Sequence, residues 1–125
     1  MNKEFIPYEQ ALALKELGVD EVTLMWRYGD KQEKLYLGSG PQDEGDIPTP
    51  LYQQAFRWFR EKHDLYGEMI NDLSNDLSNK IFVYSIYSEQ WRKVDRSEEF
   101  KTYEEAELEC LKKLIEIVKN NEEER

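Results

Sequence analysis

Cysteine, histidine and long apolar runs are scarce in this chain of 125 residues. Cys110 is the only cysteine, so no intramolecular disulfide can form, and no Cys/His cluster has the spacing of a structural zinc site. No stretch approaches the roughly 20 apolar residues that cross a bilayer, and residues 1–7 lack the apolar core of a secretion signal. We therefore expect a cytoplasmic protein with no metal site, no cofactor and no membrane contact.

Basic residues are also outnumbered: 17 Lys and Arg stand against 27 Asp and Glu, for a net charge of -10. Such a charge opposes binding to phosphate backbones and anionic membranes, so we expect no nucleic-acid partner. One local pattern argues the other way, because Arg57 and Arg60 share a predicted helix face and a basic pair follows Trp91. Acidic neighbours favour a solvated, salt-paired surface as the explanation of that pattern.

Aromatic residues, in contrast, are plentiful, with 8 Tyr, 5 Phe and 3 Trp. A chain with this many aromatics folds, and its length is that of one ordinary domain. We predict a single α+β domain over residues 1–119 and a frayed acidic tail over residues 120–125.

The first half of the chain predicts a helix, a hairpin and a loop. Pro7 suits a first helical turn, good helix formers follow, and Gly18 supplies a stop. Residues 22–28 alternate apolar and polar side chains as a half-buried strand, and residues 33–37 can return beside it. Residues 38–50 are rich in Gly, Pro and acids, which predicts a loop.

The middle of the chain predicts an amphipathic helix that begins at Thr49-Pro50, a hydroxyl N-cap followed by proline. At 100° per residue its apolar side chains fall on one face, which must be buried. That face comprises Leu51, Tyr52, Ala55, Phe56, Trp58, Phe59 and Tyr66.

The last part of the chain predicts a loop, a second hairpin and a third helix. Residues 67–79 contain a tandem Asn-Asp-Leu-Ser repeat, typical of an exposed loop, and residues 80–88 and 91–95 form the hairpin. Thr102 and Glu105 have the spacing of a capping box that begins a helix to about Lys119. The predicted order is α-β-β-α-β-β-α, with a mainly antiparallel four-stranded sheet packed with three helices.

Few residues suggest catalysis. His63, the only histidine, lies near the end of the central helix beside apolar residues and is a candidate base if burial perturbs it. Packing or helix capping is the stronger explanation of its position and needs no chemistry. Cys110 falls on the apolar stripe of the last helix, as expected of a core thiol, and no motif surrounds a Cys110–His63 dyad. We therefore assign no catalytic residue.

Carboxylates offer no clear metal site either. Asp72, Ser74 and Asp76 imitate the first three ligands of a calcium loop. Leu77 and Val83, however, stand where that loop requires glycine and a bidentate glutamate. We expect no specific metal binding.

Binding residues are sought on the sheet face that three helices on one side leave uncovered. Tyrosine is enriched in interface cores, and acidic loop residues can steer a basic partner. The candidates are Tyr36, Tyr84 and Tyr87, with Met25 on the same face, and the loop acids Asp43, Glu44 and Asp46. For each aromatic taken singly, packing in the core is the favoured alternative.

Four segments of the chain resemble a group of small uncharacterised bacterial proteins. They are the opening Pro7-Tyr8-Glu9-Gln10-Ala11 and residues 50–62, 102–107 and 110–115. Some members of that group are carried by phages or mobile elements. The resemblance covers most of the chain and implies a mobile-element origin, but it implies no activity, cofactor or site residue. The Asn-Asp-Leu-Ser doublet departs from the group.

These observations favour a small acidic, non-enzymatic protein-protein interaction module, with an accessory or inhibitor role in a mobile element as a refinement. One alternative is a small-molecule-binding protein or small enzyme whose site lies between the aromatic second helix and the sheet, with His63 as base. A homodimer with a structural role also stays open.

Overall fold

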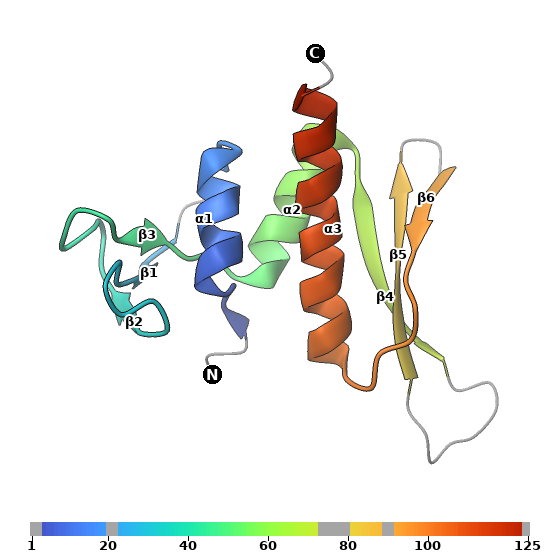
Figure 1. Cartoon of the computed structure of the whole chain (residues 1–125), viewed down its shortest axis with the longest axis horizontal. Helices are drawn as coiled ribbons and strands as arrows, with labels where there is room; N and C mark the ends of the chain where they lie inside the picture. The colour runs from blue at the N-terminus through green and yellow to red at the C-terminus, as the bar shows by residue number, and fades with distance from the viewer. Residues whose placement is uncertain (1–3, 20–22, 73–80, 89–91, 124–125) are drawn as a thin grey trace. The chain divides into compact units, whose positions relative to one another are not determined.

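The computed structural model describes residues 4–19, 23–72, 81–88 and 92–123. Within them the fold is α+β, with three helices and two three-stranded antiparallel sheets (Figure 1). The elements are α1 (Tyr8–Glu16), β1 (Met25–Arg27), β2 (Leu35–Leu37), β3 (Ile47–Pro48), α2 (Tyr52–His63), β4 (Tyr66–Asp72), β5 (Ile81–Ser88), β6 (Arg92–Arg96) and α3 (Tyr103–Glu123). The chain divides into two compact units, unit 1 (Met1–Trp58) and unit 2 (Phe59–Arg125).

The α+β class is confirmed, but the predicted four-stranded sheet is wrong. The strands form two sheets, ordered β2-β1-β3 and β4-β5-β6. The predicted order α-β-β-α-β-β-α lacks two of these strands: β3 lies inside the expected loop over residues 38–50, and β4 replaces the end of the central helix and the start of the second expected loop. The single domain stays a prediction.

In unit 1, α1 begins and ends where the sequence predicts. Pro7 is the N-cap residue. At the other end Gly18 adopts φ 90°, a conformation that glycine enters without steric strain. The amides of Gly18 and Val19 bond back to the carbonyls of Lys15 and Leu14, the pair of bonds that defines a Schellman motif.

The sheet of unit 1 is small, and side chains supplement its backbone ladder. β1 pairs antiparallel with β2 on one side and β3 on the other, which confirms the first predicted hairpin. Arg27, predicted on the polar face of its strand, is buried instead. Its Nε donates to the carbonyl of Ile6 at 2.9 Å, and Nη1 donates to the carbonyls of Gln32 and Glu33 at 3.3 and 3.2 Å. The guanidinium thus joins three chain segments.

Two glycine backbones meet where the turn after β1 contacts the end of the loop that precedes β3. A Cβ at Gly29 would lie 2.7 Å from the carbonyl oxygen of Gly45, closer than real Cβ atoms approach backbone. Gly45 itself adopts φ 97°. Position 29 therefore requires glycine because of contact, and position 45 favours it because of conformation.

The α2 helix starts two residues later than predicted. Thr49 does not act as its N-cap, because its amide donates to the carbonyl of Met25 at 2.8 Å and its carbonyl accepts from Thr23. The side chain of Gln54 instead accepts from the amide of Leu51 at 2.8 Å, one half of a capping-box interaction. The predicted aromatic stripe is confirmed, because Tyr52, Ala55, Phe56, Trp58 and Phe59 are all buried.

The end of α2 explains why Tyr66 is not helical. Asp64 takes a positive φ of 53°, which short polar residues tolerate at helix ends, and the amide of Leu65 bonds to the carbonyl of Phe59. The chain then enters β4, which pairs antiparallel with β5 from Tyr66↔Tyr87 to Asp72↔Ile81. The expected loop is thus a strand as far as Asp72, and residues 73–79 lie outside the described residues.

The second predicted hairpin is confirmed as the pair β5 and β6, with an irregular register between Ile86 and Tyr87. β5 is buried on both faces at its centre, as its sequence predicts, because Val83, Tyr84, Ser85 and Ile86 are all buried. It is the middle strand of the sheet in unit 2.

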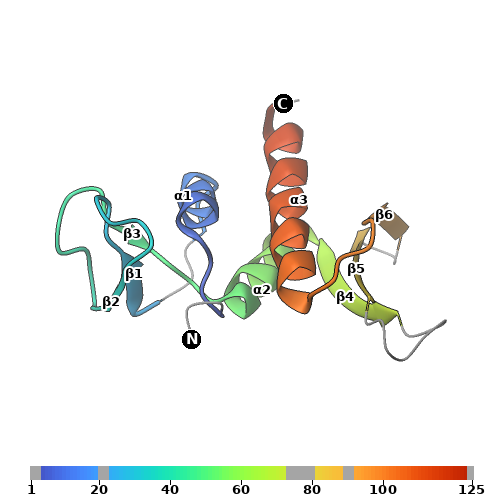
Figure 2. The same ribbon diagram turned by 60° about the horizontal axis from the view of Figure 1, so that its bottom comes forward.

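The α3 helix covers one face of that sheet and packs on β4 and β5 (Figures 1 and 2). Thr102 caps it as predicted, because its hydroxyl accepts from the amide of Glu105 at 3.1 Å. The helix runs to Glu123, beyond the expected end at Lys119. Its buried residues are Ala106, Cys110, Leu111, Leu114, Ile115 and Val118.

Candidate functional site

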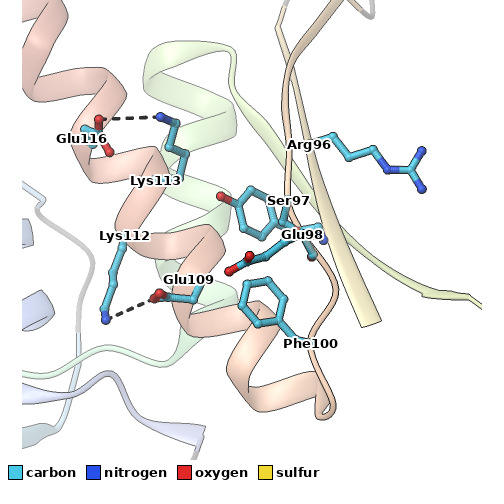
Figure 3. A pocket seen from close by; sticks show the side chains of 9 residues that line it. Arg96, Ser97, Glu98, Phe100, Glu109, Lys112, Lys113 and Glu116 are labelled. Atoms are coloured by element: carbon cyan, nitrogen blue, oxygen red, sulfur yellow. Dashed lines mark hydrogen bonds and ion pairs between the residues drawn. The ribbon is translucent and has the colours of Figure 1, made fainter. Parts of the chain in front are cut away.

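A groove of about 500 Å³ lies within unit 2, between α3 and the segment that follows β6. Figure 3 shows that most of the side chains around it are charged. The lining consists of Tyr84 from β5, Arg96 from the end of β6, Ser97, Glu98 and Phe100 from the segment, and Glu109, Lys112, Lys113 and Glu116 from α3.

An interruption of the sheet ladder forms the wall opposite α3. Ser97 and Phe100 both continue the pairing with β5: the Ser97 amide donates to the Tyr84 carbonyl, and Phe100 exchanges two backbone bonds with Phe82. The hydroxyl of Ser97 accepts from the Tyr84 amide at 2.8 Å. Glu98 and Glu99 lie between these two attachments. In Figure 3 the Glu98 carboxylate points toward α3, whereas Arg96 points away from it.

Two aromatic rings support this wall. Phe100 and Tyr84 stack with their ring centroids 6.3 Å apart and their planes 14° from parallel. Phe100 is half-buried, so part of its ring borders the groove. The stack therefore combines an apolar, electron-rich surface with the charged groups around it.

The lysines of the groove are paired with glutamates on their own helix. Lys112 Nζ lies 3.1 Å from Glu109 Oε2, and Lys113 Nζ lies 3.6 Å from Glu116 Oε1 (Figure 3). Glu109 Oε2 is shielded from solvent and receives no hydrogen bond of good geometry, although Lys112 approaches it. Among the described residues, Glu98 has no ion pair.

Tyr84 contributes a neutral phenol. Burial is the largest cause that raises the pKa of Tyr84, and the negative charge of nearby Asp95 is the next. The phenol therefore keeps its proton at neutral pH and donates to Asp95 Oδ2 at 3.3 Å. It cannot serve as a base.

In unit 1, the structure corrects the expectation that Tyr36 and Asp46 are exposed binding residues, because both are buried. The Tyr36 hydroxyl donates to Asp46 Oδ2 at 2.8 Å, and Asp46 also accepts from the amides of Gly29 at 2.8 Å and Asp43 at 3.0 Å. The Gly29 hydrogen bond is the main cause that lowers the pKa of Asp46. These hydrogen bonds hold the loop between β2 and β3 in place, so the Asp46 carboxylate is already engaged within the chain.

The other two acids of that loop, Asp43 and Glu44, are exposed as predicted. Met25, in the same unit, is half-buried. The structure thus separates the predicted acidic trio into two surface residues and one internal acceptor.

In unit 2, Tyr84 is buried and Tyr87 is half-buried. Because side chains alternate along a strand, Tyr84 and Tyr87 lie on opposite faces of β5 and cannot share one open surface. The predicted uncovered face therefore does not exist as described: its residues belong to two sheets, and two of its tyrosines are internal. Of the predicted residues, only Tyr84 lines the groove.

The nucleophile and base candidates have ordinary packing environments. Cys110 is fully buried, and burial, followed by Glu107 and Asp95, raises its pKa to about 12. A thiol of this kind is not a thiolate nucleophile at neutral pH. His63 is half-buried, with its ring centroid 6.3 Å from that of Phe59.

Metal ligation and membrane insertion find no support in the described part of the chain. No three or more His, Cys, Asp or Glu side chains gather there in a way that suits a metal ion. Ser74 and Asp76, which imitate calcium ligands, lie outside the described residues. Of the helices that the structure describes, none combines the length and apolar character needed to cross a bilayer.

Sequence reasoning missed the residues that define the groove, namely Glu98, Phe100, Lys112 and Lys113. Their positions follow from where the chain after β6 rejoins β5 and from how α3 is turned against it. The charge alternation on α3 alone indicates only a solvated helix face. Arg27 was missed because its strand pattern placed it outside.

Comparisons with family models, with curated protein sequences and with solved structures found no match.

Proposed function

We propose that this chain is a cytoplasmic, non-enzymatic protein-interaction module and that the groove of unit 2 is its contact site. The observation that carries the proposal is the groove itself: about 500 Å³ between α3 and residues 96–100, with a stacked aromatic pair and charged side chains around it.

The side chains of the groove suit binding better than catalysis. Its acids and lysines are arranged mainly as ion pairs, and its tyrosine stays protonated. Small-molecule pockets are lined mostly by apolar side chains, whereas this lining is mostly charged. Aromatic anchors surrounded by a polar rim are typical of protein interfaces.

The net charge of -10 adds a long-range component. Opposite charge on a partner raises the rate of encounter and helps to select that partner. A basic host protein is the kind of partner that this charge favours, which fits an accessory or inhibitor role in a mobile element.

The experiment is affinity capture from host lysate with three baits: the wild-type chain, Lys112→Trp and Lys119→Trp. Lys112 lines the groove, whereas Lys119 lies on the same helix, is exposed and does not line it. Both substitutions remove one positive charge and add the same bulk. We expect one stoichiometric protein to be retained by wild type and Lys119→Trp at moderate salt and lost from Lys112→Trp.

Retention of the same protein by all three baits would place the interface elsewhere and contradict the groove as contact site. Retention of nothing except the chain itself would contradict the interaction module and favour self-association. Circular dichroism of the three baits checks that each substitution leaves the fold intact.

A further inference from the structure

We infer that the groove of unit 2 binds an arginine side chain presented by a basic segment of the partner protein. This inference rests on the proposed function, since it names the chemistry that the same site recognises. Three features of the groove carry it: the unpaired carboxylate of Glu98, the partly exposed ion pair of Glu109 with Lys112, and a stacked aromatic pair.

The unpaired carboxylate belongs to Glu98. It points from the segment after β6 toward α3 (Figure 3), and it has no ion pair among the described residues. The three cations of the lining do not neutralise it: Lys112 and Lys113 are each paired with a glutamate of α3, and Arg96 points away from α3 (Figure 3). A cation that enters the groove therefore finds an available anionic partner.

Glu109, on the α3 side of the groove, is held in an ion pair that can be exchanged. Its Oε2 is shielded from solvent, and Lys112 Nζ lies 3.1 Å from it. The Lys112 side chain is 49% exposed, so it can turn into solvent when an entering guanidinium takes its place beside Glu109.

The aromatic pair selects arginine over lysine. A guanidinium is planar and stacks on a ring face while its five N–H groups donate in the plane, whereas an ammonium is a compact, strongly hydrated charge. Phe100 borders the groove and is stacked on Tyr84. A cation over such a ring is attracted by the quadrupole of the ring. One arginine can therefore stack on Phe100 while it donates to Glu98.

The test is an NMR titration of the ¹⁵N-labelled full chain with three matched peptides. The first is acetyl-Gly-Ser-Arg-Ser-Gly-amide, the second carries citrulline in place of arginine, and the third carries lysine. Citrulline keeps the shape and removes the charge. We expect amide shifts at residues 97–100 and 109–116 with the arginine peptide, weaker shifts with lysine and none with citrulline.

Two variants that each remove one negative charge distinguish binding in the groove from attraction by the net charge of the chain. Glu98→Gln should weaken binding of the arginine peptide by about two- to fivefold, the range of surface ion pairs. Glu122→Gln, an exposed site on α3 away from the groove, should leave the affinity unchanged. Both sites are exposed, so neither substitution threatens the fold.

Equal binding of the citrulline peptide, or equal weakening by both variants, would overturn the inference. The capture experiment separates that result from failure of the proposed function. If the partner is lost from Lys112→Trp while the chain binds the arginine and citrulline peptides equally, the interaction module stands and arginine recognition is refuted. A chain that binds the arginine peptide at the groove but captures no partner supports the chemistry and refutes the module.

Discussion

The strands of unit 1 are three, three and two residues long, whereas those of unit 2 are seven, eight and five. Unit 1 supplements its short ladder with buried polar side chains: Arg27 joins three segments and Asp46 fastens a loop. Unit 2 has a longer backbone ladder and the 21-residue helix α3, with apolar side chains buried along it.

The contrast shows two ways of compensating the entropy of ordering a chain. A long ladder satisfies backbone groups by itself and leaves apolar packing to stabilise the fold. A short ladder leaves carbonyls and amides without ladder partners, so side chains must supply the missing donors and acceptors. We therefore expect unit 1 to be sensitive to the loss of polar atoms and unit 2 to the loss of volume.

The largest expected effect is on the packing of unit 2. Leu114→Ala removes a fully buried side chain of α3 and should lower the free energy of unfolding by about 2–5 kcal/mol. Leu37→Ala makes the same chemical change at a side chain that is 72% exposed, and should change stability by less than about 0.5 kcal/mol. Urea unfolding followed by circular dichroism measures both. Similar losses in the two variants would contradict the contrast.

The next effect concerns the polar contacts of unit 1. Arg27→Ala leaves the carbonyls of Ile6, Gln32 and Glu33 without their donor, and should destabilise by about 1–3 kcal/mol. Lys31→Ala removes an exposed cation from the neighbouring turn and serves as control. Hydrogen exchange should accelerate in β1 and in residues 31–34 in the first variant alone. Unchanged exchange there would mean that the guanidinium does not hold these segments.

A smaller effect is expected from a single hydroxyl. Tyr36→Phe removes a donor to Asp46 and the acceptor of the Gln42 amide at 2.8 Å, so it should lower the unfolding midpoint and speed exchange of that amide. Tyr28→Phe is the matched control, because the Tyr28 ring contacts that of Tyr36 in a tilted arrangement, with centroids 4.6 Å apart, but its phenol makes no hydrogen bond among the described residues. Equal midpoints in the two variants would show that the Asp46 network is not stabilising.

The smallest effect is a pH dependence of opposite sign in the two units. Burial, then Glu104, raises the pKa of Glu107 from 4.5 to about 7, so its contribution is favourable below pH 4.5 and is lost as the pH rises toward 7. Glu107→Gln should therefore raise the melting temperature at pH 8 but not at pH 4. Glu122→Gln, at an exposed position of α3, should leave the melting temperature unchanged at both pH values.

Asp46 has the opposite sign, because hydrogen bonds lower its pKa below 3.8. Its contribution is present above pH 4 and is lost as the pH falls through the lowered pKa. Acidification below pH 4 should loosen the loop of unit 1 in the wild type, which exchange at the Gly29 and Asp43 amides would report. Protection of those amides that does not fall with decreasing pH before the whole fold is lost would contradict this assignment.

Elements with local signals could be predicted from the sequence. Pro7 and Gly18 bound α1, Thr102 caps α3, and the aromatic spacing of α2 indicates its buried face. Each of these signals acts within one turn of helix or one period of a strand, so it needs no knowledge of the partner surface.

Elements that depend on pairing could not be predicted. β3 is two residues long and includes a proline, and β4 contains Gly67, Glu68 and Asn71, which are poor strand formers. β1 and β5 determine these strands by offering an edge for pairing. The groove was missed for the same reason, because it exists only where Phe100 rejoins Phe82 and α3 lies alongside.

The contact between Gly29 and Gly45 has a practical consequence for engineering. It holds the end of the loop after β2, with the Gly29 amide also bonded to Asp46, and the beginning of that loop is held by the Gly38 amide, which donates to the carbonyl of Leu24. The exposed residues 39 and 41–44 lie between these two anchors. Exposed loop tips accept insertions when their ends are anchored. A peptide epitope grafted after Ser39, between these anchors and ahead of the Gln42 and Asp43 amides that bond to Tyr36 and Asp46, would be displayed while the strands of the sheet keep their register.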